Sequence, residues 1–245
     1  MKRFPLALLV LGISLASATH AAVKSVVLVH GAFADGSGWK PVSTILEHDG
    51  YKVYVVQEPE TGLAADVAAT RLVLDRSGPC VLVGHSWGGM IITEAGTHAS
   101  VRSLVYINAF QPIVGETAGG LQAKTPPAAK SVAPVGGGFV AVKAEDFPHD
   151  FAADLPKSVA GFMAISQVPI TAASFDDKID ASAWSEKPSY AVVSTEDRMI
   201  NPDLERFMSR RAKSETIELS GSHAIFLSHP KEIAALIEKA AQAAN

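Results

Sequence analysis

One serine of this 245-residue chain lies in a short motif that suits nucleophilic chemistry. Ser86 occupies the centre of a G-x-S-x-G pattern at 84–88, directly after an apolar run and directly before a helical pattern. In a sharp strand-to-helix turn, side chains two residues either side of the serine would collide, so glycine is required there. The first amides of the helix can stabilise a negative oxygen beside the hydroxyl. Ser86 is therefore the candidate nucleophile.

A serine hydroxyl needs a base to take its proton, and eight histidines compete for this role. In chains with this serine turn, an acid and then a histidine follow the serine, each just after a late strand. This order leaves His223 and His229. His229 precedes Pro230 at the start of a predicted helix, whereas His223 stands in a small-residue loop after the apolar run at 216–219. We predict that His223 is the base.

A carboxylate must orient that histidine by accepting the proton of its Nδ1 atom and by stabilising the imidazolium. The apolar run at 190–194 leads directly to Glu196 and Asp197, and either residue fits the role. The preceding strand end carries Asn108, which cannot serve as a charged group. The acid is therefore expected at 196 or 197.

The end of the first predicted strand is the expected source of an oxyanion-binding amide. The run at 25–29 leads to His30, Gly31, Ala32 and Phe33. A loop at this position supplies one backbone N–H, and the residue after the serine supplies the other. We assign these donors to Ala32 and Trp87, with the amide of Phe33 as the alternative for the first of them.

Apolar, β-branched runs alternating with helical patterns place these residues on an α/β fold. Such runs are typical of strands buried on both faces of a parallel sheet. We predict strands at 25–29, 51–56, 80–83, 103–107, 191–194 and 216–219, and helices at 39–47, 63–74, 90–98, 202–211 and 230–243. The sequence thus predicts one domain over 22–245, with a mostly parallel central sheet and helices on both faces.

The alternation stops between about 111 and 187, in a segment rich in Ala, Pro and Gly. We interpret it as an inserted cap. Its stretch at 155–168 has apolar residues at helical spacing, which suits a lid over a pocket and core packing equally well. Candidate substrate-binding side chains in and around this segment are Phe33, Phe110, Phe162 and Met163.

The composition argues against several classes of partner. Charged residues make up 19% of the chain, the formal net charge is -4 and the isoelectric point is near 6.1, so no nucleic-acid partner is expected. A small, uncharged organic molecule is the expected substrate, and no metal site is expected. The single cysteine, Cys80, opens an apolar run and is expected to be a buried structural thiol.

The N-terminus has the pattern of a secretory signal peptide. Lys2 and Arg3 precede an apolar run at 4–15, which is too short to span a membrane, and small residues follow. Cleavage after Ala18 or Ala21 fits this pattern. The sequence therefore predicts a signal peptide at 1–21, a secreted or periplasmic protein, and no membrane anchor after cleavage.

Four segments together resemble the α/β-hydrolase superfamily, and within it the small methyl-esterase and hydroxynitrile-lyase group of serine esterases. They are 30–39, 84–89, 196–200, and His223 with the downstream His229 and Pro230. The resemblance implies an eight-strand-type sheet, no cofactor, and a small ester whose acyl group passes to Ser86 and is released by water. It also favours Asp197 over Glu196 as the acid.

Two other functions stay open. A hydroxynitrile lyase or a cofactor-free perhydrolase uses the same triad. The lyases of this group replace the glycine after the first-strand histidine, and this chain keeps Gly31, which argues against cyanohydrin cleavage. A non-catalytic small-molecule binding protein is the third possibility, and the presence of serine, histidine and acid argues against it.

Overall fold

The computed structural model describes residues 23–244, in which a parallel sheet of six strands forms the centre of the molecule. The strand order is β2-β1-β3-β4-β8-β9, and each neighbouring pair runs parallel. The strands are β1 Ser25–Val29, β2 Lys52–Val55, β3 Cys80–His85, β4 Val101–Ile107, β8 Ser189–Ser194 and β9 Glu215–Leu219. Because all six are parallel, their carboxyl ends meet at one edge of the sheet.

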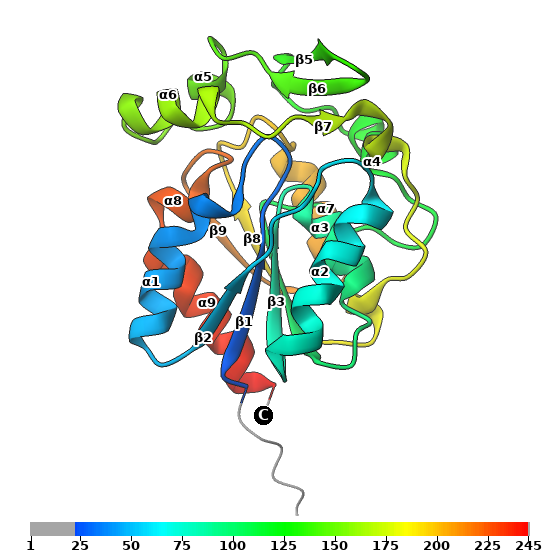
Figure 1. Ribbon diagram of the computed structural model, residues 1–245, viewed down its shortest axis with the longest axis vertical. Helices are drawn as coiled ribbons and strands as arrows, with labels where there is room; N and C mark the ends of the chain where they lie inside the picture. Colours follow the sequence, from blue (N-terminus) through cyan, green and yellow to red (C-terminus); the bar gives the residue numbers. More distant parts are fainter. Residues whose placement is uncertain (1–22, 245) are drawn as a thin grey trace, which may run out of the picture.

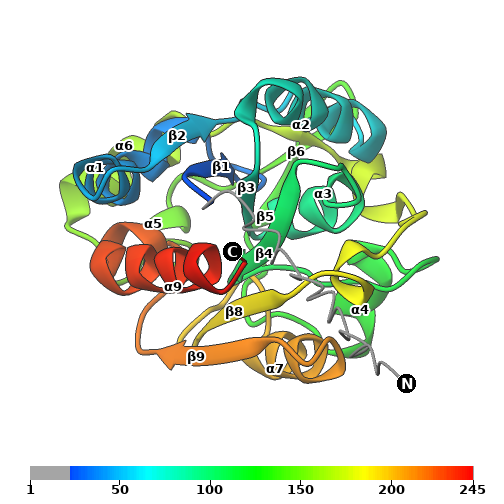
Figure 2. The same ribbon diagram turned by 90° about the horizontal axis from the view of Figure 1, so that it is seen from below.

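Helices cover both faces of this sheet because its central strands are apolar on both sides. Val26 and Leu28 of β1 pack in the core shared with α1 and α9, whereas Val27 and Val29 face the core of α2, α3 and α7. Figure 2 shows α1 and α9 on one side of the sheet and α2 and α3 on the other. The helices are α1 Lys40–His48, α2 Leu63–Ser77, α3 Gly88–Ala95, α7 Pro202–Arg211, α8 Ile225–Ser228 and α9 Pro230–Ala243.

Most predicted elements are present with small differences in their ends. Helices α7 and α9 have the predicted bounds. The helix expected at 39–47 begins as a short 3-10 helix, η1 Gly36–Trp39, and continues as α1. The side chain of Asp35 accepts the N–H of Ser37 and caps this first turn, which starts the helical backbone before the apolar pattern does.

The expectation of an eight-strand-type sheet is wrong for the described residues, because the central sheet has six strands. β2 forms one edge, and only Val23 and Lys24 precede β1 in the described part of the chain. The nearby β5, β6 and β7 pair with one another in a separate antiparallel sheet instead.

The segment between β4 and β8 lies across the carboxyl ends of the central strands, as Figure 1 shows. It holds short elements joined by long loops, which explains why no single period runs through its sequence. In chain order they are α4 Ala118–Lys124, β5 Val132–Gly136, β6 Phe139–Val142, α5 Phe147–Asp150, α6 Lys157–Ile165, β7 Ile170–Thr171, η2 Ala172–Asp176 and η3 Ala183–Ser185. This arrangement places the segment over the edge where the candidate site residues emerge.

The predicted signal peptide at 1–21 lies outside the described residues. Within residues 23–244, no helix combines the length and the apolar character needed to cross a membrane. Cys80 is buried at the start of β3, as expected for a structural thiol.

Candidate active site

Ser86 lies in a strained turn between β3 and α3. Its φ is 53°, in the left-handed region that non-glycine residues rarely adopt. A Cβ atom on Gly84 would lie 2.6 Å from the carbonyl oxygen of Gly88, and one on Gly88 would lie 2.5 Å from that of His30. Both glycines are therefore required by close backbone contacts, and the turn presents the serine hydroxyl at the carboxyl edge of the sheet.

The structure brings Ser86, His223 and Asp197 together in a hydrogen-bonded chain. The Oγ atom of Ser86 lies 2.8 Å from Nε2 of His223, and Nδ1 of the same ring lies 2.6 Å from Oδ2 of Asp197. Because a carboxylate only accepts, Nδ1 donates and Nε2 accepts the hydrogen bond of the serine hydroxyl. All three residues are buried. This tautomer is the one that a general base needs for deprotonating serine.

The backbone after β8 selects Asp197 rather than Glu196 as the partner of His223. The second carboxylate oxygen of Asp197 accepts the N–H groups of Met199 and Ile200 at 2.7 and 3.0 Å. These bonds hold the carboxylate in a buried turn. Glu196 is exposed and accepts a hydrogen bond from Ser220 instead. The two carboxylates that the sequence left open therefore have different environments.

The two residues expected to supply oxyanion-binding amides, Ala32 and Trp87, line the same cavity as Ser86. Ala32 follows β1 and Trp87 begins the turn into α3, and within the described chain neither N–H donates a hydrogen bond. Phe33, the alternative donor, has a φ of 66°, so the loop that carries these amides is strained. A Cβ atom on Gly31 would lie 2.6 Å from that of Ser86, so this loop packs directly against the nucleophile.

A cavity of about 380 Å³ opens at Ser86 and His223. Its polar side chains away from the catalytic residues include Gln122 and Lys130. Most of the remaining lining is apolar and comes from the loops after β1 and β4, the segment above the sheet and the loop after β8: Ala32, Phe33, Phe110, Ala129, Val132, Val140, Phe175, Met199 and Ile200. Phe33 and Phe110, two of the four predicted substrate-binding residues, therefore line the cavity at Ser86.

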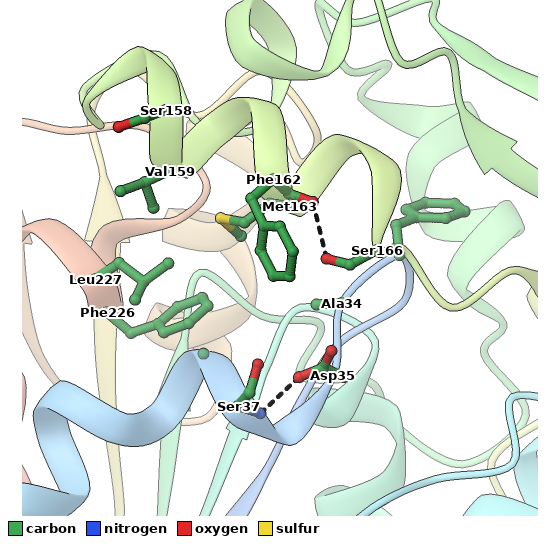
Figure 3. A pocket seen from close by; sticks show the side chains of 12 residues that line it. Ala34, Asp35, Ser37, Ser158, Val159, Phe162, Met163, Ser166, Phe226 and Leu227 are labelled. Carbon is green, nitrogen blue, oxygen red and sulfur yellow. Dashed lines mark hydrogen bonds between the residues drawn. The ribbon is translucent and has the colours of Figure 1, made fainter.

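Phe162 and Met163 line a different cavity, of about 340 Å³, between α6 and the start of η1 (Figure 3). Phe226 and Leu227 of α8 form another part of its wall, and Phe33 lines both cavities. The side chain of Phe162 is 65% exposed. This helix therefore forms the wall of a neighbouring hollow rather than a lid in contact with Ser86.

A buried glutamate that the sequence analysis did not single out lies beside the triad. Glu205 of α7 has a buried carboxyl group next to that of Asp197. Burial first, and then the charge of Asp197, raise the pKa of Glu205 well above its usual value. Two carboxyl groups in contact need a proton between them, so Glu205 is held as the neutral acid. In the sequence it resembles an ordinary acidic residue in the first turn of a helix.

Two further buried residues support the turn. His85 donates from Nε2 to the carbonyl oxygen of His223 at 2.9 Å, and burial lowers its pKa well below the usual value. The imidazole is therefore neutral. Asp66 of α2 accepts the indole N–H of Trp87 at 2.9 Å. Neither role could be predicted from the sequence. Each contact joins segments that are distant along the chain, His85 with His223 and Asp66 with Trp87.

Among the described residues, one group of side chains has the composition of a metal site. His30, Glu58 and Glu60 are buried behind the loop that carries Ala32. The chain of contacts from Ser86 to Asp197 does not include them.

Comparison with known proteins identifies the family and the fold to which this chain belongs. The sequence profile described as "Alpha/beta hydrolase family" matches residues 26–236. A carbendazim hydrolyzing esterase from Nocardioides sp. (strain SG-4G) is 30% identical over 126 residues, which are 45% of this chain and 52% of that protein. The matched part therefore spans about half the length of this curated relative.

Solved structures with the same architecture include two enzymes of low sequence identity. A pyrethroid hydrolase from Sphingobium faniae JZ-2 has a TM-score of 0.78 and 21% identity, with 90% of this chain and 98% of that chain covered. The methylesterase protein MES16 from Arabidopsis has a TM-score of 0.72 and 20% identity, with 89% and 98% covered. These similarities confirm the fold class that the sequence predicts.

Proposed function

Because this chain belongs to the alpha/beta hydrolase family, we propose that it hydrolyses a small carboxylic ester through an acyl-enzyme on Ser86. The observation that carries this proposal is the pair of hydrogen bonds that link Ser86 to His223 and His223 to Asp197, at 2.8 and 2.6 Å. These residues lie at the wall of a mostly apolar cavity. The esterase names of its relatives support the same class of reaction.

In the first half-reaction, Ser86 attacks the ester carbonyl carbon while its proton passes to Nε2 of His223. The carbonyl oxygen becomes negative and accepts the N–H groups of Ala32 and Trp87, which are free to donate. Asp197 stabilises the imidazolium that forms. The bond to the leaving alcohol then breaks, and His223 returns the proton to the alcohol oxygen. The acyl group remains on Ser86.

In the second half-reaction, His223 takes a proton from a water molecule, whose oxygen attacks the acyl carbon. The same two amides stabilise the second oxyanion. Ser86 leaves with the proton from His223, and the carboxylic acid is released. The buried Glu205 beside Asp197 is neutral and adds no second negative charge to the triad. Asp197 is therefore the carboxylate that stabilises the imidazolium of His223.

The cavity supports an uncharged substrate with apolar substituents. Its volume of about 380 Å³ fits a small organic ester, and most of its lining side chains are apolar. The neighbouring cavity beside Phe162 (Figure 3), which also has Phe33 in its lining, adds apolar surface. We therefore propose that esters with apolar acyl or alcohol groups are preferred over charged ones.

Labelling with a fluorophosphonate probe tests the nucleophile. We expect a single label, mapped by peptide mass to Ser86, that is lost in both Ser86→Ala and His223→Ala. Incubation with p-nitrophenyl acetate should release nitrophenol and acetate in equal amounts. A folded protein that takes no label would overturn the proposal in favour of a binding protein. Cleavage of a cyanohydrin without ester turnover would identify a lyase.

A further inference from the structure

Three ionisable side chains meet in the protein interior behind the oxyanion loop. His30 follows β1, and Glu58 and Glu60 lie in the loop between β2 and α2. Their exposed fractions are 2%, 6% and 0%. One ligand atom from each lies within 4.8 Å of the others. The ester mechanism proposed above uses none of these side chains.

The carboxylates of this cluster lack hydrogen-bond donors. Within the described residues, neither side-chain oxygen of Glu60 accepts a hydrogen bond, and the same holds for Glu58. One oxygen of Glu58 is in direct contact with Nε2 of His30, and one oxygen of Glu60 lies 3.6 Å from Nδ1 of the same ring. A further buried carboxylate, that of Asp66, lies nearby and accepts a hydrogen bond from the backbone N–H of Glu60. Burying charged carboxylates without donors is strongly unfavourable, so a proton or a metal cation is needed here.

The orientation of the His30 ring indicates where that charge belongs. Nδ1 lies 3.0 Å from the carbonyl oxygen of Gly31, and since a carbonyl only accepts, Nδ1 carries a proton. The backbone N–H of Glu58 points at Nε2 at 3.3 Å, which makes Nε2 an acceptor. A lone pair and a carboxylate in contact repel each other unless a proton or a metal ion lies between them. Metal-bound histidines commonly have this arrangement, with the other ring N–H donated to a carbonyl.

We propose that His30, Glu58 and Glu60 form a buried site for a divalent transition-metal ion, with Zn²⁺ as the ion that best matches the donors. Imidazole and carboxylate ligands suit Zn²⁺, whereas Ca²⁺ prefers six to eight oxygen ligands. Zn²⁺ bonds of about 2.0–2.2 Å place ligand atoms about 3.5 Å apart. On binding, the widest separation in the cluster therefore closes by about an ångström, and the Glu58 oxygen moves away from Nε2 of His30 to admit the ion. The sequence predicts no metal site, because His30 is distant along the chain from Glu58 and Glu60 and the three residues match no ligand motif.

The ion stabilises the scaffold of the active site rather than the reaction itself. It links the end of β1 to the loop before α2. The N–H of Glu60 donates to Asp66, and Asp66 accepts the indole N–H of Trp87. The site therefore connects, through two hydrogen bonds, to the turn that carries Ser86. Its existence does not depend on whether the substrate is an ester.

A shared proton is the competing explanation for the same cluster. Burial by itself would lower the pKa of His30, but the Glu58 and Glu60 carboxylates outweigh it and raise the pKa to about 9. A proton on Nε2 would then satisfy Glu58, and a neutral Glu60 would need no cation. The two explanations differ in one respect: a proton-held cluster tolerates glutamine at position 60 and binds no metal.

Refolding in the presence of zinc tests the site, because a buried ion has to enter before the interior closes. The full-length protein is unfolded in urea with a chelator and refolded with or without ZnCl₂. Bound zinc per chain is then measured by mass spectrometry after removal of free metal, together with the midpoint of thermal unfolding. Wild type is compared with Glu60→Gln. The matched control is Asp75→Asn, whose carboxylate is 66% exposed and pairs with His98 at the surface.

We expect one tightly bound zinc per chain in wild type and in Asp75→Asn, with an unfolding midpoint raised by roughly 5 °C or more at saturating zinc. Glu60→Gln should lose both effects, while CaCl₂ should shift none of the three proteins. The proposal is overturned if refolded wild type keeps no stoichiometric zinc, or if Glu60→Gln keeps as much as wild type. If Glu60→Gln does not refold, Glu58→Gln replaces it with the same expectations.

Discussion

The indole nitrogen of Trp87 donates a hydrogen bond of 2.9 Å to Oδ2 of Asp66. This bond joins α2 to the turn after β3, and the other oxygen of Asp66 accepts the N–H of Glu60 at 2.9 Å. Trp87 supplies one of the two amides that we assign to the oxyanion. Asp66 therefore positions the oxyanion-binding backbone from a helix that contributes no side chain to the triad.

Replacing Asp66 by alanine should destabilise the protein and slow its reaction. Two buried N–H donors lose their acceptor, at about 1–3 kcal/mol each. We expect the free energy of unfolding in urea to fall by about 2–5 kcal/mol, and kcat for p-nitrophenyl acetate to fall more than KM rises. Asp66→Asn keeps one acceptor oxygen and should lose less on both measures. Equal stability of Asp66→Ala and wild type would contradict this role.

Asp197→Asn and Glu196→Gln should differ greatly in activity. Asparagine cannot stabilise the imidazolium of His223, and its amide can hold the ring in the wrong tautomer, so kcat should fall by about 10³–10⁴. Glu196 is exposed, and its loss removes a surface hydrogen bond to Ser220. Its glutamine variant should stay within about twofold of wild type. Steady-state ester hydrolysis measures both variants, and the reverse ranking would move the acid to position 196.

Glu205→Gln should change the pH dependence of stability. The folded-state pKa of Glu205 is raised, chiefly by burial, so the folded protein retains a proton that the unfolded chain releases. Between the unfolded-state pKa, near 4.3, and the higher folded-state pKa, this group lowers stability by about 1.4 kcal/mol per pH unit. Below that window it is neutral in both states and has no effect.

Glutamine does not ionise, and its amide can still donate to Asp197. The variant should therefore match wild type near pH 4 and exceed it increasingly at higher pH, with little change in kcat. Urea unfolding from pH 4 to 8 measures the difference. A stability difference that is independent of pH would show that Glu205 is not held as the neutral acid.

Alanine at two glycines should have opposite effects on stability. A Cβ atom on Gly84 meets the backbone of Gly88 at 2.6 Å, so Gly84→Ala should destabilise by about 2–4 kcal/mol and displace Ser86. Gly161, inside α6, has no atom within 4 Å of the same position. There, alanine should stabilise by about 0.5–1 kcal/mol because of its higher helix propensity. Similar losses in both variants would argue against the steric account of the turn.

The sequence by itself determined the central framework and pointed to the nucleophile and the base of the triad, while it left the acid open between Glu196 and Asp197. Buried parallel strands require continuous apolar runs, and the G-x-S-x-G turn requires its glycines, so both leave a pattern in the chain. Ser86 and His223 follow from that pattern and from chain order. The first residues of α7 and α9 follow from the proline at the start of each helix.

Only the tertiary structure decided what depends on contacts between distant segments. The separation of Phe162 and Met163 from the catalytic cavity depends on how α6 packs, and no period in 111–187 specifies that packing. The contact of Glu205 with Asp197 and the meeting of His30 with Glu58 and Glu60 likewise require folded geometry. The sequence shows the position of an acidic residue but does not say whether its side chain faces water or another buried charge. Its surroundings in the fold determine its protonation and its role.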